Sequence, residues 1–182
     1  MKVALLLAEG FEELEALTPV DILRRAGIEI DTIAIASRNV TGSHGITVVA
    51  DKVQDEVDPK DYTAVIFPGG MPGATNLDAS EFSDRMISAV IENGGRLAAI
   101  CAAPLVLGHR GLLDGKAATC YPGFEKELIG AKVTDAAVVT DGNITTARGM
   151  GVALEFSKEL ISLICGREKS DEISRGIMEE RK

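Results

Sequence analysis

The amino-acid sequence predicts an α/β fold, a doubly wound sandwich in which helices cover both faces of a mostly parallel sheet. Short runs that are apolar throughout alternate with longer, amphipathic segments. The first two apolar runs flank one helical segment and so form a βαβ unit, which implies parallel strands and a right-handed crossover. Glycine- and proline-rich turns follow later strands, at the sheet edge where open α/β folds place their ligands.

The βαβ unit comes first. Residues 3–8 are short and apolar throughout, as expected of a buried parallel strand. A helix then runs from Glu12 to about Arg25, and Gly27 is its stop signal. Pro19 either kinks this helix or divides it into two short pieces. A second strand follows at 28–36.

The middle of the chain begins with an irregular part and returns to strand and helix. We expect a turn at 41–45 and a strand at 46–49, in a small hairpin outside the main sheet. An acidic loop at 55–61 precedes the next main strand. The main elements expected here are a strand at 62–67, a turn-rich loop at 68–73, a helix at 81–93 and a strand at 97–100 that ends at Cys101.

The last third continues the alternation, and the whole chain, 1–182, is expected to be a single domain. A helix follows Cys101. The remaining elements expected are a short strand at 115–120, a short helix at 124–129, strands at 133–140 and 144–147 joined by a turn, a helix at 152–165 and a polar, helical tail at 168–182.

Composition excludes several classes of function. The formal net charge is −9 and there is no basic stripe, which argues against nucleic acid and anionic membranes as main partners. The N-terminal apolar run is too short for a membrane span and lacks the cleavage pattern of a signal peptide, so we expect a cytoplasmic protein. The three cysteines are odd in number and form no CxxC pair, so neither a disulfide framework nor a zinc site is expected.

Cys101 is the leading candidate for a reactive group. It stands at a strand-to-helix turn, where a side chain is held out of the sheet as in the nucleophile elbow of hydrolases. Backbone N–H groups at the start of a helix lack internal partners, so they lower the pKa of a thiol and bind a developing oxyanion. The alternative is that Cys101 is simply a small buried hydrophobe.

A reactive thiol needs a partner. His44 lies in a turn, and His109 lies two turns along the helix and points away from the elbow, so a Cys–His dyad is weakly supported. Glu15 follows the first strand and projects towards the same sheet edge. A buried, protonated Glu15 would donate a hydrogen bond to an ionised Cys101, the pair sharing one proton. The alternative for the 12–15 acidic run is a solvated first turn favoured by the helix dipole.

Other catalytic signatures are missing from the sequence. There is no G-x-S-x-G elbow, no P-loop and no H-E-x-x-H. The sequence therefore does not indicate a serine hydrolase, a P-loop nucleotide-binding protein or a zinc protease. Gly69 and Gly70 follow the strand expected to neighbour that of Cys101, and both turns should face one crevice.

Five motifs together resemble the ThiJ/PfpI superfamily, and most closely its parkinsonism-associated deglycase (DJ-one) branch. The resemblance extends from Val3 to about Gly166. The motifs are, in order, Glu12-Glu13-Leu14-Glu15; Pro19 to Gly27; Pro68-Gly69-Gly70; Ala99-Ile100-Cys101-Ala102-Ala103-Pro104; and Thr146 to Gly151.

This resemblance implies a flavodoxin-like sandwich that forms a homodimer and needs no metal or organic cofactor. It implies that Cys101 is the reactive cysteine and Glu15 its protonated hydrogen-bond partner. It also implies that the backbone of Gly69, Gly70 and Ala102 lines the pocket and supplies oxyanion donors.

Further segments match the family's dimer interface and pocket, and three positions depart from its pattern. Arg25, His44 and 148–151 match those segments. His44 replaces the family's usual arginine, which puts an anion contact in doubt. Tyr121 replaces a histidine found in many relatives, and it could donate a hydrogen bond or transfer a proton. Ala102 stands where the protease branch has a histidine, so peptidase activity is not supported.

Three functions compete on this basis. The first is a cysteine-dependent glyoxalase III or protein deglycase acting on methylglyoxal, glyoxal or their early adducts, giving lactate or glycolate. The second is an oxidative-stress sensor or chaperone that uses oxidation of Cys101. The third is an amidotransferase-like domain, which ranks last because a suitably placed histidine is missing.

Overall fold

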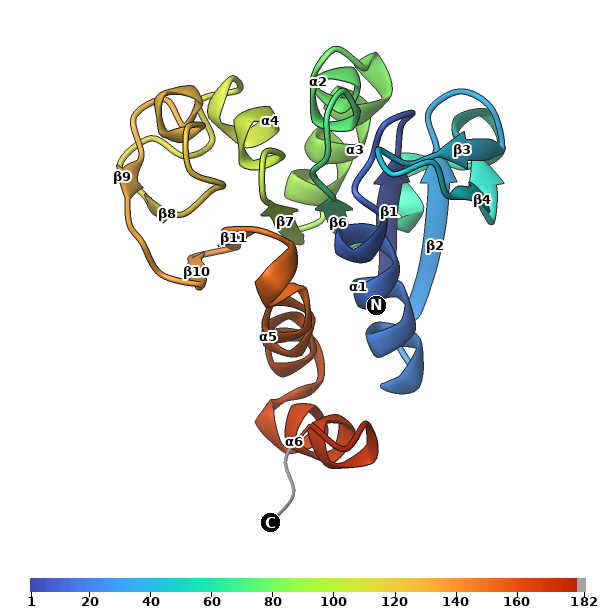
Figure 1. Ribbon diagram of the computed structural model, residues 1–182, viewed down its shortest axis with the longest axis vertical. Helices are drawn as coiled ribbons and strands as arrows, with labels where there is room; N and C mark the ends of the chain where they lie inside the picture. Colours follow the sequence, from blue (N-terminus) through green and yellow to red (C-terminus); the bar gives the residue numbers. More distant parts are fainter. Residues whose placement is uncertain (180–182) are drawn as a thin grey trace.

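A seven-stranded sheet runs through the computed structural model, which describes residues 1–179 (Figure 1). Its strand order is β10-β11-β7-β6-β1-β2-β5, and only the pair β10–β11 is antiparallel. The strands are β1 (Lys2–Leu7), β2 (Glu29–Ala34), β5 (Lys52–Val53), β6 (Ala64–Phe67), β7 (Arg96–Ile100), β10 (Val138–Asp141) and β11 (Ile144–Ala147). The expected doubly wound, flavodoxin-like α/β sandwich is confirmed.

Two hydrophobic cores lie on the two faces of this sheet. Leu6 of β1 belongs to one core, and its neighbours Leu5 and Leu7 belong to the other. Successive strand residues point to opposite faces, so a strand covered on both sides must be apolar throughout. One face carries α1 (Glu13–Arg25) and α5 (Ala153–Cys165), with α6 (Arg167–Gly176) packed on α5; the other carries α2 (Gly73–Asp78), α3 (Glu81–Glu92) and α4 (Pro104–Gly108).

Two small sheets flank the main one on opposite sides in Figure 1. The expected hairpin is present as β3 (Asn39–Thr41) and β4 (Thr47–Val49), and it lies outside the main sheet. Strands β8 (Ala117–Ala118) and β9 (Lys132–Val133) form the second, parallel pair.

Some expected elements are wrong in type or extent. The segment 133–140 is not one strand, because its start pairs with β8 and its end pairs with β11, which belong to different sheets. Helix α2 is not predicted by the sequence, which indicates only a turn-rich loop at 68–73 and no element directly after it. The helix begins at Gly73 without a side-chain cap at its N-terminus, so the sequence contains no ordinary signal for a helix start.

Three further expectations are adjusted by the structure. Helix α1 continues past Pro19 without division. Residues 55–61 and 124–129 contain only short 3₁₀ turns, the latter at Glu125–Glu127. The helical tail is present as α6, but 180–182 lie outside the described residues. Within 1–179, no helix combines the length and apolar character needed to cross a bilayer.

Candidate active site

Cys101 occupies a strained turn directly after β7. Its φ is 64°, a left-handed conformation that non-glycine residues rarely adopt. Two hydrogen bonds hold this conformation: the Cys101 N–H donates to the carbonyl of Ala147 (2.8 Å), and the N–H of Tyr121 donates to the carbonyl of Cys101 (2.8 Å). Helix α4 begins three residues later, at Pro104, so Cys101 lies in the turn between strand and helix, as expected. The turn itself, and not a helix, presents the thiol.

Glu15 reaches the same point from the first turn of α1. Its residue is 1% exposed, and its Oε2 accepts a hydrogen bond from the N–H of Gly69 (3.0 Å). A Cβ added to Gly69 would lie 2.6 Å from that oxygen and 2.7 Å from the Cβ of Cys101. Gly69 is therefore wedged between the two side chains, and only a glycine fits there. The structure thus brings together Cys101, Glu15 and the Gly69 loop.

Burial raises the pKa of both side chains, Glu15 and Cys101. Desolvation, assisted by the charge of Glu12, raises the pKa of Glu15 to about 7 in spite of hydrogen bonds from Cys101 and from the N–H groups of Gly69 and Met150. Desolvation and the neighbouring Glu15 also raise the pKa of Cys101. The pair resists carrying two negative charges, so around neutrality it holds at most one.

Backbone donors surround the thiol. The N–H groups of Gly70 and Ala102 form hydrogen bonds to Cys101 and favour its ionised form, although burial and Glu15 outweigh them in setting its pKa. The expected lowering is therefore present as a contribution but not as the net shift. Gly70 has φ +84° and packs so closely on the segment before α1 that an added Cβ would lie 2.3 Å from the nitrogen of Glu12. A larger residue therefore does not fit at Gly70.

Tyr121 forms a wall beside the pair. The residue is 51% exposed, and its ring lies 3.3 Å from where a Cβ on Gly149 would stand, with Oε1 of Glu15 4.0 Å from the same point. A hollow of about 420 Å³ opens here; its lining residues are Tyr121, Pro122, Arg148, Gly149, Met150, Gly151 and Val152. Its volume suits a small molecule, and it adjoins the pair through Tyr121 and Gly149, although neither Cys101 nor Glu15 lines it.

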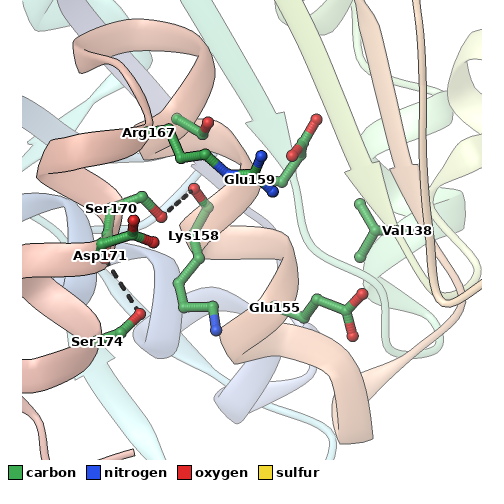
Figure 2. A pocket seen from close by; sticks show the side chains of 9 residues that line it. Val138, Glu155, Lys158, Glu159, Arg167, Ser170, Asp171 and Ser174 are labelled. Carbon is green, nitrogen blue, oxygen red and sulfur yellow. Dashed lines mark hydrogen bonds between the residues drawn. The ribbon is translucent and has the colours of Figure 1, made fainter.

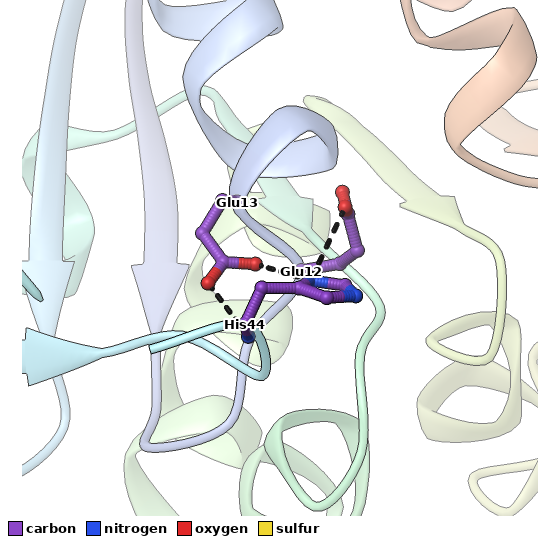
Figure 3. A group of neighbouring side chains, drawn as sticks. All are labelled: Glu12, Glu13 and His44. Carbon is purple, nitrogen blue, oxygen red and sulfur yellow. Dashed lines mark hydrogen bonds and ion pairs between the residues drawn. The ribbon is translucent and has the colours of Figure 1, made fainter. Parts of the chain in front are cut away.

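His44 lies beside α1 and belongs to a carboxylate cluster with Glu12 and Glu13 (Figure 3). Its Nδ1 donates to Oε2 of Glu13 (2.8 Å), and its backbone N–H donates to Oε1 of the same residue (2.8 Å). Hydrogen bonding to Glu13 raises the pKa of His44. The ligand atoms of the three residues lie within 4.8 Å of one another, a spacing that a metal could use, but hydrogen bonds already occupy both oxygens of Glu13.

The other histidine and Arg25 lie away from the pair. His109 follows α4 and bonds to Asp78 through Nδ1 and to Glu127 through Nε2, both at 2.8 Å. It thus points away from Cys101, as expected. Arg25 is at the far end of α1 and pairs with Asp21. Neither residue contributes to the site described here.

A second hollow lies between α5 and α6 (Figure 2). Its volume is about 330 Å³, and its lining is rich in charged side chains such as Lys158, Glu159 and Asp171. Ser170 Oγ donates to the carbonyl of Lys158 (3.0 Å) and ties the two helices together. None of the candidate site residues lines it, so it is separate from the Cys101 site.

The resemblance points to the segment 148–151, and the structure adds what two of its residues do. The N–H of Met150 bonds to Glu15, and Gly149 separates the Tyr121 ring from that carboxyl. The glycines that flank Met150 signal a close backbone approach, but only the fold shows that Glu15 is what they approach.

Comparison with known proteins places the chain in a family. The DJ-1/PfpI family profile matches residues 1–163. The chain is 34% identical to a deglycase of Pyrococcus abyssi, covering 90% of this chain and 99% of that protein. It is 37% identical to the Arabidopsis thaliana protein DJ-1 homolog B, of which it spans only 40% while covering 95% of its own length.

Solved structures also point to this family. The structure of oxidized Toxoplasma gondii DJ-1 matches with a TM-score of 0.93 and 34% sequence identity, over 97% of both chains. The profile, the relatives and the fold all point to one family. The chain is a member of the DJ-1/PfpI family.

Proposed function

We propose that this protein is a cofactor-free enzyme of the glyoxalase III or deglycase type, with Cys101 as nucleophile and Glu15 as proton carrier. The observation that carries the proposal is the meeting of the Cys101 thiol and the buried Glu15 carboxyl at Gly69. A carboxyl whose pKa lies near 7 both gives and takes protons at neutral pH, which is what a general acid–base group requires. The name of the Pyrococcus relative, a deglycase, points in the same direction.

The chemistry follows from these two groups. The ionised Cys101 sulfur attacks the aldehyde carbon of methylglyoxal, and protonated Glu15 gives its proton to the former carbonyl oxygen, so that a hemithioacetal forms. The Glu15 carboxylate then removes the proton from that carbon and returns it to the neighbouring carbon, while the hydroxyl proton moves to the neighbouring oxygen. The product is the lactate thioester of Cys101. Water cleaves the thioester and releases lactate and the free thiol. An early adduct on an amine or guanidine would first break its carbon–nitrogen bond, the hydroxyl proton passing to the nitrogen; the free amine or guanidine leaves and the released dicarbonyl enters the same sequence.

The backbone and Tyr121 have supporting roles in this proposal. The N–H groups of Gly70 and Ala102 stabilise the thiolate and the oxygen that gains charge during attack. Gly69 positions Glu15. The ring of Tyr121 forms one wall of the hollow that receives the substrate. Ala102 offers no histidine to Cys101, so peptidase activity is not part of the proposal.

A second candidate function is sensing of oxidants by the same thiol. Cys101 is half-buried, and the N–H groups of Gly70 and Ala102 would also bind the oxygens of a sulfinate. Mild peroxide treatment followed by peptide mass spectrometry should oxidise Cys101 ahead of buried Cys120 and exposed Cys165. Oxidation that follows exposure, with Cys165 first, would remove this candidate.

The proposed setting is a homodimer in the cytoplasm. All three cysteines are free, as suits a reducing compartment. Exposed apolar side chains gather near the start of α1 and on the β3–β4 hairpin, which Glu13 joins through the N–H groups of His44 and Ile46. These side chains are Leu14, Leu17, Ile46 and Val49. A second copy covering them would remove this apolar surface from water.

The decisive experiment measures lactate formed from methylglyoxal by the wild type, Cys101→Ala and Cys120→Ala. Loss of turnover in the first variant alone supports the proposal. Equal turnover in the wild type and Cys101→Ala would show that another group performs the reaction.

A further inference from the structure

A closed ring of three hydrogen bonds links Glu12, Glu15 and Gly69. The Glu15 N–H donates to Oε2 of Glu12 (2.7 Å). The Glu12 N–H donates to the carbonyl of Gly69 (2.9 Å), and the Gly69 N–H donates to Oε2 of Glu15 (3.0 Å). Glu12 thus holds both the backbone of Glu15 and the loop that binds the Glu15 carboxyl.

The side chain of Glu12 is also nearly enclosed. Only 13% of it is exposed, although it is the N-cap of α1, where side chains usually reach into solvent. Interactions between charges are screened least when the charges are buried. The Glu12 carboxylate therefore acts at close range, through little water, on the carboxyl of Glu15 one helical turn away. Its charge is among the causes that raise the pKa of Glu15.

We propose that Glu12 is a positioning residue for the reactive pair: its N-cap bond fixes Glu15 against Gly69, and its negative charge keeps the shared proton on Glu15 and Cys101. This inference rests on Cys101 and Glu15 acting as a pair, but it does not depend on which substrate they process. Glu12 itself neither attacks nor transfers a proton.

The charged groups around this arrangement come from a small number of elements. On α1 itself, the carboxylate of Glu13 lies within 4.8 Å of that of Glu12 and bonds to His44. From the β3–β4 hairpin, Nδ1 of His44 lies 3.9 Å from Oε1 of Glu12. The loop after β6 contributes the N–H of Gly69, and the segment before α5 contributes the N–H of Met150. The turn after β7 contributes Cys101. Within residues 1–179, His44 is the basic side chain that comes within 4.0 Å of the Glu12 carboxylate, so it would weaken the effect of Glu12 when protonated.

The test uses alkylation of Cys101 by iodoacetamide, followed peptide by peptide with mass spectrometry across pH. The pair titrates as a unit, so the midpoint of Cys101 alkylation reports how firmly the pair holds its protons. Glu12→Gln keeps an oxygen to accept the Glu15 N–H but removes the charge. We expect its midpoint to fall by about one pH unit.

Two controls separate charge from structure. Glu12→Asp retains the charge and a good N-cap residue, and its midpoint should stay near that of the wild type. Glu92→Gln makes the same change in net charge at the end of α3, which precedes β7 and so lies at the opposite edge of the sheet. Its midpoint should also stay unchanged. An unmoved midpoint in Glu12→Gln, or an equal shift in Glu92→Gln, would overturn the proposal.

Two backgrounds show whether Glu12 acts through Glu15. In a Glu15→Gln background the added Glu12→Gln change should leave the Cys101 midpoint nearly in place, since the proton carrier is gone. In a His44→Asn background the shift should persist. A full shift without Glu15, or no shift without His44, would mean that Glu12 acts by another route. Neither measurement uses methylglyoxal, so a failed turnover assay cannot be mistaken for failure here.

Discussion

The N–H of Gly69 and Oε2 of Glu15 lie 3.0 Å apart, joining residues that are 54 positions apart in the chain. Gly69 leaves no room for a larger residue, since an added Cβ would lie 2.6 Å from that oxygen and 2.7 Å from the Cβ of Cys101. The consequences of this contact can be measured.

Gly69→Ala should nearly abolish lactate formation and cost about 1–3 kcal/mol of stability, because the methyl group must push Glu15 and Cys101 apart. Activity assays and urea unfolding test both effects. Gly176→Ala is the matched control, since a Cβ at Gly176 meets nothing within 4 Å. Normal turnover in Gly69→Ala would show that the close contact is not needed for reaction.

Glu15→Gln should change how stability depends on pH. The pKa of Glu15 is about 7 in the native state and 4.5 ordinarily, so the native state binds the extra proton and wild-type stability falls as pH rises from about 4.5 to 7. Glutamine does not ionise, so the stability of the variant should not fall in this way as pH rises. Between pH 5 and 8 the wild type should lose about 2 kcal/mol relative to the variant. Urea unfolding of both proteins at the two pH values measures the difference, and parallel curves would contradict a buried, protonated carboxyl.

Tyr121 allows a test of ring against hydroxyl. Tyr121→Phe retains the ring beside Gly149 and the N–H that binds the Cys101 carbonyl, so kcat and KM should stay within about threefold. Tyr121→Ala removes a wall of the hollow and should raise KM about tenfold or more, with a smaller effect on kcat. Steady-state kinetics with methylglyoxal distinguish the two. A large loss of kcat in the Phe variant would instead assign proton transfer to the phenol.

His109 should stabilise the protein more at low pH than at high pH. Hydrogen bonds to Glu127 and Asp78 raise its pKa above 6.5, so its contribution is fully present below about pH 6.5 and is lost as pH rises through the native pKa. The stability difference between wild type and His109→Asn should therefore be larger at pH 6 than at pH 9. Urea unfolding at both pH values provides the check, and a constant difference would show that the imidazole bonds in its neutral form.

The exposed apolar side chains allow a test of the proposed dimer. Val49 is 70% exposed and Leu14 is 52% exposed, so a charged residue at either position is tolerated in a monomer. Leu14→Glu and Val49→Glu should shift sedimentation from dimer to monomer while the folded signal in circular dichroism is retained. Met178→Glu, also at an exposed residue (67%), is the control for added charge. A wild type that sediments as a monomer would refute the assembly.

The sheet and the choice of Cys101 and Glu15 as candidate site residues can be predicted from the sequence because they depend on local patterns. The apolar runs, the turn before Gly69 and the acidic run near Glu15 each mark a position at one sheet edge. The left-handed turn at Cys101 is not accessible in this way, because bonds to Ala147 and Tyr121 from distant segments impose it. Which influence dominates the pKa of Cys101 is inaccessible for a related reason: the net rise follows first from burial and then from Glu15, and a short stretch of sequence does not reveal burial.

The site is built from α1, the β6 loop, the β7 turn and the segment that begins α5, so no continuous piece of the chain contains it. A polypeptide emerging during synthesis has an ordinary thiol at Cys101 until β1, β6, β7 and β11 are paired and Met150 has been added. The surroundings that raise the pKa of Cys101 are therefore assembled only after the chain has been made at least as far as Met150 and has folded.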